Sequence, residues 1–488
     1  RVAPATHEGT GNPVPDRIDE KACFLCKLSQ GINKSLAPGR VAEGKMKTPE
    51  EIIQAVFNAG VVGAGGGGFP THIKLKAQVD TVIANGSECE PLLGSDKALL
   101  KNRAYAVIDG LKLAMSATGA GTGYIAVKGD YEDIVAVLKK EIPPDGSITL
   151  HLLDNYYPAG DEFLTVYDVT GRIIPEGGLP LHVGVLVSNV LSLAQISDAV
   201  NGKPVTERPV TIAGSVRQPQ VVTVPIGTTY RDLIELAGGT LEPTDVLLDG
   251  GPMMGTIVDD PGRGIARTTG GVTVLPEDHH IIKMQNISLS GMVKKSKAAC
   301  CQCIRCSDLC PRNLLGHALY PHMTMRTIDY NLAEPTGHIT SAFLCSQCGM
   351  CELVACDVMQ LSPKRIYAEY KKLLAAKGIK NPHRLSPTSV SPELEYRKVP
   401  ISTLIKKIGI SEYEGSVPVR GFQKVNRVRI PLDKHTGAPA LPKVAPGERV
   451  KMGDVIAASP PDTPGALCHA SIAGKVTEVT GQWIELKE

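Results

Sequence analysis

The first regular pattern in the chain is an amphipathic helix that begins just after residue 48. Thr48 is the expected N-cap, and Glu51 completes a capping box with it. Apolar residues then recur every three to four positions, at Ile52, Ile53, Val56 and Phe57. This spacing predicts one buried helical face, and Gly60 is expected to end the helix.

Further along, short apolar runs alternate with helical patterns. The runs 81–84 and 124–127 predict buried strands, and a long helical stretch between them extends to about Met115. Strands that alternate with helices predict an α/β core for this part of the chain.

The later regions have other patterns. Between residues 208 and 257, a strand pair, a helix at 229–237 and a further strand follow each other in the order of a β-grasp fold. A helix that begins at Ser362-Pro363 has the expected apolar face Ile366, Tyr367, Tyr370 and Leu373. Residues 381–427 are expected to form a linker, and from 428 onward short strands alternate with Gly and Pro turns. The expected fold class is multidomain α/β plus α+β.

Composition narrows the function classes. The 488 residues are 42% hydrophobic with a net charge of +2, which suits several globular domains. No long basic stretch stands out, so nucleic-acid binding has no electrostatic support. No apolar run approaches the length that spans a bilayer, so we expect neither a nucleic-acid partner nor a transmembrane segment.

Eight cysteines carry the strongest chemical signal. The first run holds Cys300, Cys303, Cys306 and Cys310, and the second holds Cys345, Cys348, Cys351 and Cys356. Three cysteines at CxxCxxC spacing can hold one face of a cubane, and the more distant fourth serves the other cluster when two such runs share a fold. The spacing predicts two [4Fe–4S] clusters, one on Cys300, Cys303, Cys306 and Cys356, the other on Cys345, Cys348, Cys351 and Cys310.

The alternative to clusters is structural zinc, which usually takes two CxxC pairs or Cys with His. Triplets with remote fourth ligands fit zinc poorly, and the surplus Cys301 is expected to have no ligand role. Cys23 and Cys26 form a separate CxxC, which supplies two ligands, half of a zinc site. Three interpretations stay open: a zinc site completed by another chain, a redox pair, or no function. Thiolates bound to clusters imply a reducing, intracellular compartment.

A second candidate site begins at a glycine-rich segment, residues 63–70. Four consecutive glycines, 65–68, remove every Cβ from one stretch of backbone, which allows close approach of a planar or phosphorylated ligand. A flexible turn is the alternative interpretation.

Four segments in the same order resemble the NADH-binding subunit of respiratory complex I. They are the glycine loop at 63–74, Asn-Gly-Ser-Glu-Cys-Glu-Pro at 85–91, Tyr-Pro-Ala-Gly-Asp-Glu at 157–162 and Val-Ser-Asn-Val at 187–190. The β-grasp region resembles the SLBB module of the same subunit. Together with the cysteine runs, this makes the chain similar to the RnfC/PduS-like family. Its barrel-sandwich segment follows the cysteines, which is the domain order of the cobalamin-reductase members.

The resemblance implies specific roles for residues of these segments. FMN would lie on Gly63, Gly65, Gly66, Gly67 and Lys74, with Asn85, Ser87 and Glu88 at its isoalloxazine or ribityl groups. Phe69 and Glu90 would face the nicotinamide nucleotide. Glu88 and Glu90 are alternate residues at a strand end, so we expect both carboxylates to point the same way and to reach one pocket. The site would be completed by Tyr157, Gly160, Asp161, Glu162, Ser188 and Asn189. No separate catalytic residue is implied. Three positions depart from the family's pattern, with Ala64 for Arg, Asp161 for Glu and Ser188 for Asn.

The resemblance also implies the domain organisation. An N-terminal extension with the CxxC spans 1–45, an FMN/NADH-binding α/β domain 46–205 and an SLBB β-grasp module 206–270. A helical ferredoxin-like domain for two [4Fe–4S] clusters spans 290–380, the linker 381–427 and a lipoyl-like barrel-sandwich hybrid 428–488.

The implied function is that of an NADH-oxidising electron-transfer protein, with NAD(H), FMN and two [4Fe–4S] clusters as cofactors and a partner protein or a corrinoid as acceptor. A cobalamin reductase, one subunit of a larger oxidoreductase and a wiring subunit with an inactive nucleotide site are the alternatives. The expected location is the cytoplasm, within a bacterial microcompartment or at the inner face of a membrane complex. The turn 459–462 lacks a carrier lysine, so the last module is expected to be a docking surface; His435 and His469 are expected to be structural, with corrin ligation as the alternative.

Overall fold

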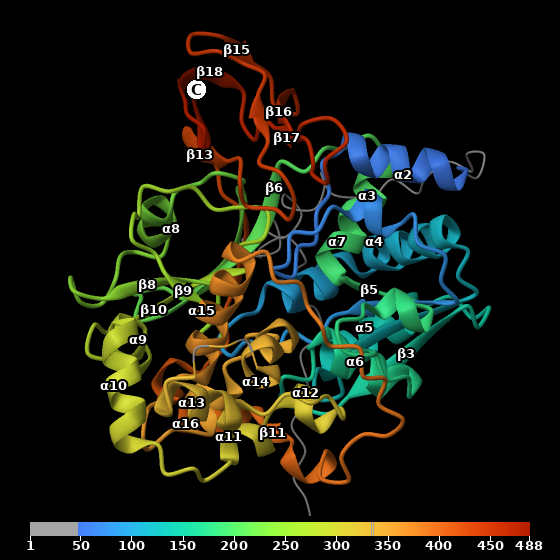
Figure 1. The fold of residues 1–488 in the computed structure, drawn as a ribbon. Coiled ribbons are helices and arrows are strands. Elements are labelled where there is room, and N and C mark those ends of the chain that lie inside the picture. The colour runs from blue at the N-terminus through green and yellow to red at the C-terminus, as the bar shows by residue number, and fades with distance from the viewer. Residues whose placement is uncertain (1–46, 333, 335) are drawn as a thin grey trace, which may run out of the picture. The chain divides into compact units, whose positions relative to one another are not determined.

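The computed structural model describes residues 47–332, 334 and 336–488, so the Cys23–Cys26 segment lies outside the described residues. The elements described below belong to the unit Thr48–Glu488. Figure 1 shows these elements and labels many of them.

The first part of this unit is built on a parallel sheet of four strands in the order β3-β2-β1-β5. The strands are β1 (Thr81–Asn85), β2 (Thr122–Lys128), β3 (Ile148–Leu153) and β5 (Val185–Asn189). Helices and short elements around them are α2 (Pro49–Asn58), α3 (Thr71–Lys74), α4 (Ser95–Thr118), α5 (Glu132–Glu141), β4 (Tyr156–Tyr157), α6 (Glu162–Thr170), the 3-10 turn η1 (Pro180–Val183) and α7 (Val190–Val200). The expected α/β core and the strands at 81–84 and 124–127 are confirmed.

The start of α2 follows from local rules alone. The Thr48 hydroxyl accepts a hydrogen bond from the Glu51 amide at 3.3 Å, and the Glu51 carboxylate accepts one from the Thr48 amide at 2.8 Å. This pair satisfies two backbone donors that the first helical turn leaves free. The helix ends at Asn58, and Gly60 follows in the left-handed region with φ +69°, so both predicted ends are confirmed.

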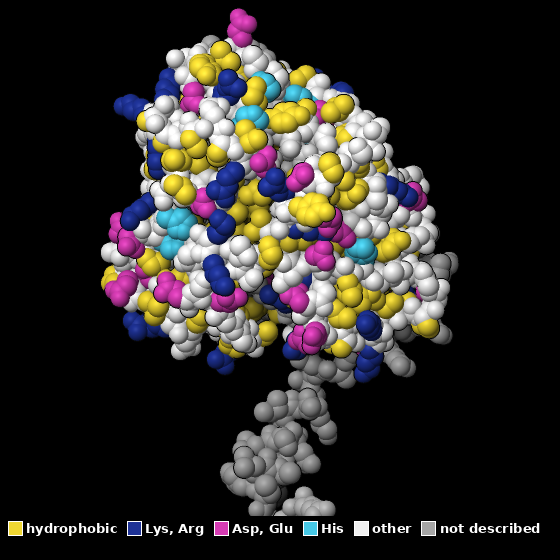
Figure 2. All heavy atoms as spheres, turned by 90° about the horizontal axis from the view of Figure 1, so that it is seen from below, with side chains coloured by type: hydrophobic (Ala, Val, Ile, Leu, Met, Phe, Trp, Pro, Cys, Tyr) yellow, Lys and Arg dark blue, Asp and Glu magenta, His cyan; other side chains and the backbone are white. Residues whose placement is uncertain are grey.

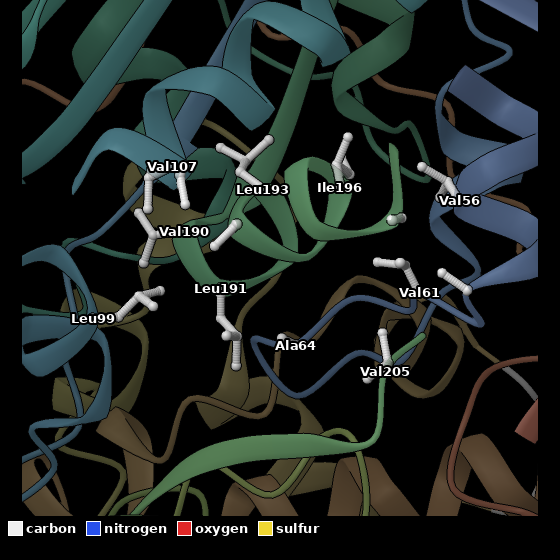
Figure 3. Packing of buried hydrophobic residues seen from close by; sticks show 14 of the residues in the cluster. Val56, Val61, Ala64, Leu99, Val107, Val190, Leu191, Leu193, Ile196 and Val205 are labelled. Carbon is white, nitrogen blue, oxygen red and sulfur yellow. The ribbon is translucent and has the colours of Figure 1, made fainter. Parts of the chain in front are cut away.

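The largest core lies between α2, α4 and α7 (Figure 3). Helices α4 and α7 pack closely because Gly110 has no side chain; a Cβ there would lie 1.8 Å from the carbonyl oxygen of Leu193. Ala64 of the glycine-rich loop packs into the same core. The loop and the start of α7 are therefore held against one rigid body.

The β-grasp region forms a sheet of six strands in the order β12-β7-β6-β10-β8-β9. Its elements are β6 (Glu207–Gly214), β7 (Gln220–Pro225), α8 (Tyr230–Leu236), β8 (Val246–Asp249), β9 (Thr256–Ile257), β10 (Gly271–Leu275) and β12 (Val419–Phe422). The predicted order of hairpin, helix and strand is confirmed.

The cysteine region is helical. Its elements are α9 (His280–Asn286), α10 (Leu289–Ala299), α11 (Arg305–Asp308), α12 (Pro311–Leu314), α13 (Pro321–Asp329), α14 (Gly337–Thr340), η2 (Ser341–Leu344), η3 (Met350–Val354) and α15 (Pro363–Ala376). Ser362 caps α15 as expected, accepting from the Arg365 amide at 3.2 Å. The expectation for Leu373 is wrong: it is 55% exposed, whereas Leu374 is buried. The inward face follows the i, i+4, i+8 positions, with Ile366 and Leu374 buried and Tyr370 partly buried between them.

Residues 381–427, expected to be a linker, contain ordered elements that join other domains. They are η4 (Glu395–Arg397), β11 (Val399–Pro400), α16 (Ile401–Lys407), η5 (Ser411–Tyr413) and β12. Strand β11 pairs with β4, and β12 extends the β-grasp sheet beside β7. Leu404 and Ile405 of α16 are buried in the core that also holds Met350 and Leu353 of the second cysteine run. Such long-range pairing leaves no local pattern in a Pro-rich stretch.

The last module has two small sheets, ordered β13-β19-β18-β15 and β14-β16-β17. The strands are β13 (Arg427–Pro431), β14 (Leu441–Pro442), β15 (Arg449–Val450), β16 (Val455–Ala458), β17 (Cys468–His469), β18 (Gly474–Val479) and β19 (Trp483–Lys487). Its apolar residues join the core of the first part, so the module is packed against the α/β domain.

Among the described residues, none of the helices combines the length and the apolar character needed to cross a bilayer. Figure 2 shows a face on which acidic, basic and hydrophobic side chains are interspersed. This mixture agrees with the small net charge of +2.

Candidate functional site

The glycine-rich loop follows helix α2 and presents an open stretch of backbone. Gly65, Gly66 and Gly67 are exposed, and a Cβ built on Gly66 or Gly67 would have no atom within 4 Å. The ends of the loop are closed by a hydrogen bond from the Gly63 amide to the Phe69 carbonyl at 2.9 Å. Phe69, at the end of the loop, is 40% exposed.

Ala64 explains how the loop is anchored. Its amide donates to the hydroxyl of buried Ser192 on α7 at 2.8 Å, and its side chain is only 5% exposed. Residue 64 therefore faces the core and not the open side of the loop. The absence of an arginine here, noted from the sequence, follows the direction of this side chain.

Lys74 supplies a cation near the end of α3. Its ammonium donates to the carbonyl of Val187 and lies 3.3 Å from the Glu162 carboxylate. Both side chains are partly exposed, at 32% and 38%. The structure thus brings together residues from the first, third and fourth motifs.

The carboxyl ends of β1 and β5 place two asparagines side by side, because Asn85 pairs with Asn189 in register. The Asn85 amide donates to the carbonyl of Gly160 at 2.9 Å. Asn189 caps α7, accepting from the Leu191 amide at 2.9 Å, and donates to Asp96 at 2.7 Å. Ligands of open parallel sheets bind at this edge. Ser87 and Ser188, at 0% and 8% exposure, lie buried beneath it.

Glu88 closes the start of α4. Its carboxylate accepts from the amides of Asp96 and Lys97, both at 2.9 Å, and from the Ser95 hydroxyl at 3.3 Å. A carboxylate at a helix N-terminus is favoured because free amides and the helix dipole converge there. Burial and the nearby Glu88 raise the pKa of Asp96.

The Glu90 side chain points away from the start of α4, where Glu88 lies. One of its oxygens accepts from the Met253 amide at 3.0 Å, and its other oxygen, Oε1, is buried with no hydrogen-bond partner. Burial raises the pKa of this carboxyl to about 7. The expectation that Glu88 and Glu90 point the same way is wrong, because β1 ends at Asn85 and Glu88 adopts φ +38°, which breaks the alternation of a strand.

The third of the four segments, residues 157–162, contacts the second cysteine run; it is called the third motif below. The Tyr157 hydroxyl donates to the carbonyl of Cys348 at 2.6 Å. Asp161 caps α6 and pairs with buried Arg312 at 2.5 Å. The Cys89 thiol, which the sequence did not single out, accepts from the Gly160 amide at 2.8 Å. Arg312 was not predicted from the sequence either; the one signal that points to it is its position directly after Cys310 and Pro311.

The second group of thiols lines one small cavity. Its walls include Cys310, Cys345, Cys348 and Cys351, together with Arg312 and Lys364. Cys310 comes from the first run, as the spacing predicts. Burial raises the pKa of the Cys348 thiol to about 11, so a cluster that binds thiolates releases protons here.

The first group of thiols lies nearer to solvent. Burial first, and then the charges of Cys356, Cys303 and Cys300, raise the pKa of Cys306 to about 12. Cys356 of the second run packs against the same hydrophobic cluster as Cys300 of the first triplet. Cys303 and the neighbouring Cys301 are exposed.

The residues present fit the implied cofactors. The open glycines and Lys74 suit a phosphate-bearing planar ligand, and four thiols around one cavity suit a cubane. Within the described ranges no three His, Cys, Asp or Glu side chains are arranged for a single metal ion. The geometric case for clusters therefore rests on the cysteine spacing and on the two groupings of thiols.

The last module also reaches the glycine loop. Thr436 donates from its amide to Gly68 at 2.9 Å and from its hydroxyl to Gly67 at 2.7 Å, both at carbonyl oxygens. The neighbouring His435 lies 3.0 Å from the Ala438 carbonyl, and His469 is 5% exposed within the core. The structural role expected for both histidines stays a prediction.

A glycine loop at the carboxyl edge of a parallel sheet and two groups of four cysteines in the same unit are the features of a flavo-iron–sulfur oxidoreductase. Family models match in the same order: the Nuo51 FMN-binding domain at 56–198, the SLBB domain at 209–257, a 4Fe-4S dicluster domain at 299–361 and the RnfC barrel sandwich hybrid domain at 410–487.

Curated relatives extend these matches over most of the chain. The cobalamin reductase PduS of Citrobacter freundii is 40% identical over 91% of this chain and 98% of that protein. One component of the Na⁺-translocating ferredoxin:NAD⁺ oxidoreductase complex of Acetobacterium woodii is 34% identical over 54% of this chain and 58% of that protein. A chain of an NAD⁺-reducing [NiFe]-hydrogenase crystal structure matches with a TM-score of 0.46 at 20% identity, over 69% of this chain and 63% of that chain.

The chain belongs to the family of the PduS cobalamin reductases. It is an electron-transferring oxidoreductase with an NADH- and FMN-binding domain and a domain for [4Fe–4S] clusters. The predicted family, fold class, cofactors and relay function are thereby confirmed.

Proposed function

We propose that the protein oxidises NADH and delivers single electrons to a corrinoid acceptor. FMN would supply a hydride acceptor and the clusters would supply one-electron carriers, a combination that joins a two-electron donor to a one-electron acceptor. The observation that carries the proposal is the contact between the third motif and the second cysteine group, the 2.6 Å hydrogen bond from Tyr157 to the Cys348 carbonyl.

The proposed cofactor-holding residues follow from the site geometry. Backbone amides of the open glycines and the Lys74 ammonium would hold the FMN phosphate, and Asn85 and Asn189 would frame its ring at the sheet edge. Glu88 is already engaged at the start of α4, so its proposed role is to shape that edge. One cluster is proposed to lie on Cys310, Cys345, Cys348 and Cys351, and the other on Cys300, Cys303, Cys306 and Cys356.

Glu90 is proposed to contact the nicotinamide nucleotide. Support comes from Oε1, a buried acceptor without a partner, which a ribose hydroxyl would satisfy; an unpaired buried polar group costs about 1–3 kcal/mol. Glu90→Gln should raise the KM for NADH in an assay with an artificial acceptor and leave FMN content unchanged. An unchanged KM together with lost flavin would refute the assignment.

The flavin site can be tested without straining the backbone. Gly67→Ala adds one methyl group to the open face, where the chain itself offers no obstacle within 4 Å. We expect loss of FMN from the purified protein, whereas Gly66→Val adds strain as well because Gly66 has φ +104°. Gly121→Ala is the matched control, since a Cβ there also meets no atom within 4 Å. Retention of FMN by Gly67→Ala, or extraction of FAD in place of FMN, would contradict the proposal.

The acceptor separates the rival functions. The relative's name, cobalamin reductase, supports a corrinoid, and the match to a component of a ferredoxin:NAD⁺ oxidoreductase complex supports delivery to partner proteins. NADH-dependent reduction of cob(III)alamin by the purified chain would establish the first. NADH bleaching without corrinoid reduction would favour a role within a larger complex, and no bleaching at all would favour a wiring role. The proposed setting is the cytoplasm, in a microcompartment or at the inner face of a membrane complex.

A further inference from the structure

A buried ion pair joins the third motif, residues 157–162, to the second group of cysteines, Cys310, Cys345, Cys348 and Cys351. The Arg312 guanidinium lies 2.5 Å from the Asp161 carboxylate, and the two side chains are only 8% and 9% exposed. Asp161 is the N-cap of α6 in the α/β domain, and Arg312 lies in α12, two residues after Cys310. The pair thus spans 151 residues of sequence.

Neighbouring groups hold both members in place. The Asp161 oxygen that binds Arg312 also accepts from the Phe163 amide at 3.0 Å and the Leu164 amide at 3.3 Å. The guanidinium carbon lies 3.8 Å from the centre of the Phe163 ring. Arginine suits such a site because its planar group can stack and donate at once. Asp161 is therefore committed to α6 and Arg312 and does not face the glycine loop.

Arg312 is the member of the pair that lies nearer to the thiols. It lines the cavity of Cys310, Cys345, Cys348 and Cys351, whereas Asp161 is not part of the cavity wall. Lys364, which also lines this cavity, lies 3.5 Å from Glu352. Arg312 therefore belongs to the wall around the thiols, and its counter-charge Asp161 lies outside that wall.

We propose that Arg312 is a positioning residue that sets the reduction potential of the cluster on these four cysteines, and that Asp161 offsets part of its charge. The inference rests on the proposed ligation by these cysteines. A reduced cluster carries one more negative charge, so a nearby buried cation stabilises the reduced form and raises the potential. The pair thereby couples the domain that takes electrons from NADH to the first acceptor beside it.

The test is a redox titration of the anaerobic holoprotein, followed by electron paramagnetic resonance, with iron content measured on each sample. Arg312→Gln should shift the potential of one cluster to more negative values, because it leaves the Asp161 charge alone. Asp161→Asn should shift the same cluster in the opposite direction. Arg312→Lys should give a smaller negative shift, since it keeps the charge but not the stacked, planar geometry.

The double variant Asp161→Asn/Arg312→Gln leaves no unpaired charge and guards against loss of folding. It should also lower the potential, by less than Arg312→Gln, because the nearer charge of the two is the cation. Arg305→Gln is the matched control. Arg305 lies in the loop of the first cysteine group, 3.4 Å from the Asp357 carboxylate, and the two side chains are 47% and 25% exposed. This control should leave the affected cluster unchanged.

Shifts of the same sign in the two single variants, or a double variant with the wild-type potential and full iron content, would overturn the inference. Wild-type protein without any iron–sulfur signal would instead refute the proposed function, so the two failures are distinguishable.

Discussion

The two cysteine groups share a backbone shape but not an environment. In the first loop Gln302 and Ile304 adopt left-handed φ values of 58° and 60°; in the second, Gln347 and Gly349 do so at 63° and 82°. These residues occupy equivalent positions around Cys303 and Cys348. Equal spacing thus produces equal loops, which is what a cubane requires.

The surroundings of the loops differ. Cys310 and Cys351 of the second group are buried, whereas Cys303 of the first is exposed and Ile304 beside it is 46% exposed. The second group faces the buried pair of Arg312; the first has the partly exposed pair of Arg305. The comparison teaches that ligand spacing sets what is bound, while packing sets which cluster meets the flavin domain and which meets solvent.

The largest expected effect is loss of one whole cluster, and it tests the crossed fourth ligands. Cys310→Ser should remove the cluster of the second triplet, and Cys356→Ser that of the first. Each variant should keep about half of the eight irons expected from two cubanes. Cys301→Ser is the control and should keep all of them; zinc in place of iron would contradict the ligand assignment.

The next largest expected effect is a difference between the two clusters in their sensitivity to oxidants. Because the first group lies nearer to solvent, exposure of the holoprotein to air should destroy its cluster before that of the second group. The spectra of Cys310→Ser and Cys356→Ser identify each signal. Equal decay rates would show that the difference in exposure of the loops does not control access to the clusters.

The ion pairs beside the groups should differ in stability. Arg312→Ala leaves Asp161 buried and unpaired, which typically costs about 3–5 kcal/mol. Arg305→Ala breaks a partly exposed pair and should cost at most about 1 kcal/mol. Urea unfolding of the anaerobic holoproteins measures both changes in the free energy of unfolding. Equal changes in the two variants would contradict the expected difference between the buried and the exposed pair.

The smallest expected effect concerns the equivalent left-handed positions. Gly349→Ala should destabilise the protein by about 1–3 kcal/mol, because its Cβ would lie 2.7 Å from the Met253 carbonyl and L residues are strained at this φ. Ile304→Gly should be neutral or stabilising by up to about 1 kcal/mol, since it relieves a β-branched residue at positive φ. Thermal unfolding measures both; destabilisation by Ile304→Gly would show that its exposed side chain contributes more than its backbone costs.

Much of the fold could be predicted from local signals. The Thr48–Glu51 capping box, the buried runs that became β1 and β2, and the β-grasp order all depend on neighbours within a few residues. The segment 381–427 could not be predicted, because β11 and β12 are ordered by strands more than 190 residues earlier in the chain. The Glu88–Glu90 alternation failed for a local reason, the positive φ at Glu88.

The sequence by itself determined the chemistry of the site: the thiols and their spacing, the stretch of glycines without Cβ atoms and the cation of Lys74. These are properties of residue type and of distance along the chain. Only the tertiary structure decided that Ala64 faces the core, that Glu90 lies under Met253, and that Asp161 turns from the glycine loop toward Arg312. Such choices depend on which distant surfaces pack together and on which buried charges find a partner, and neither is written in the local pattern.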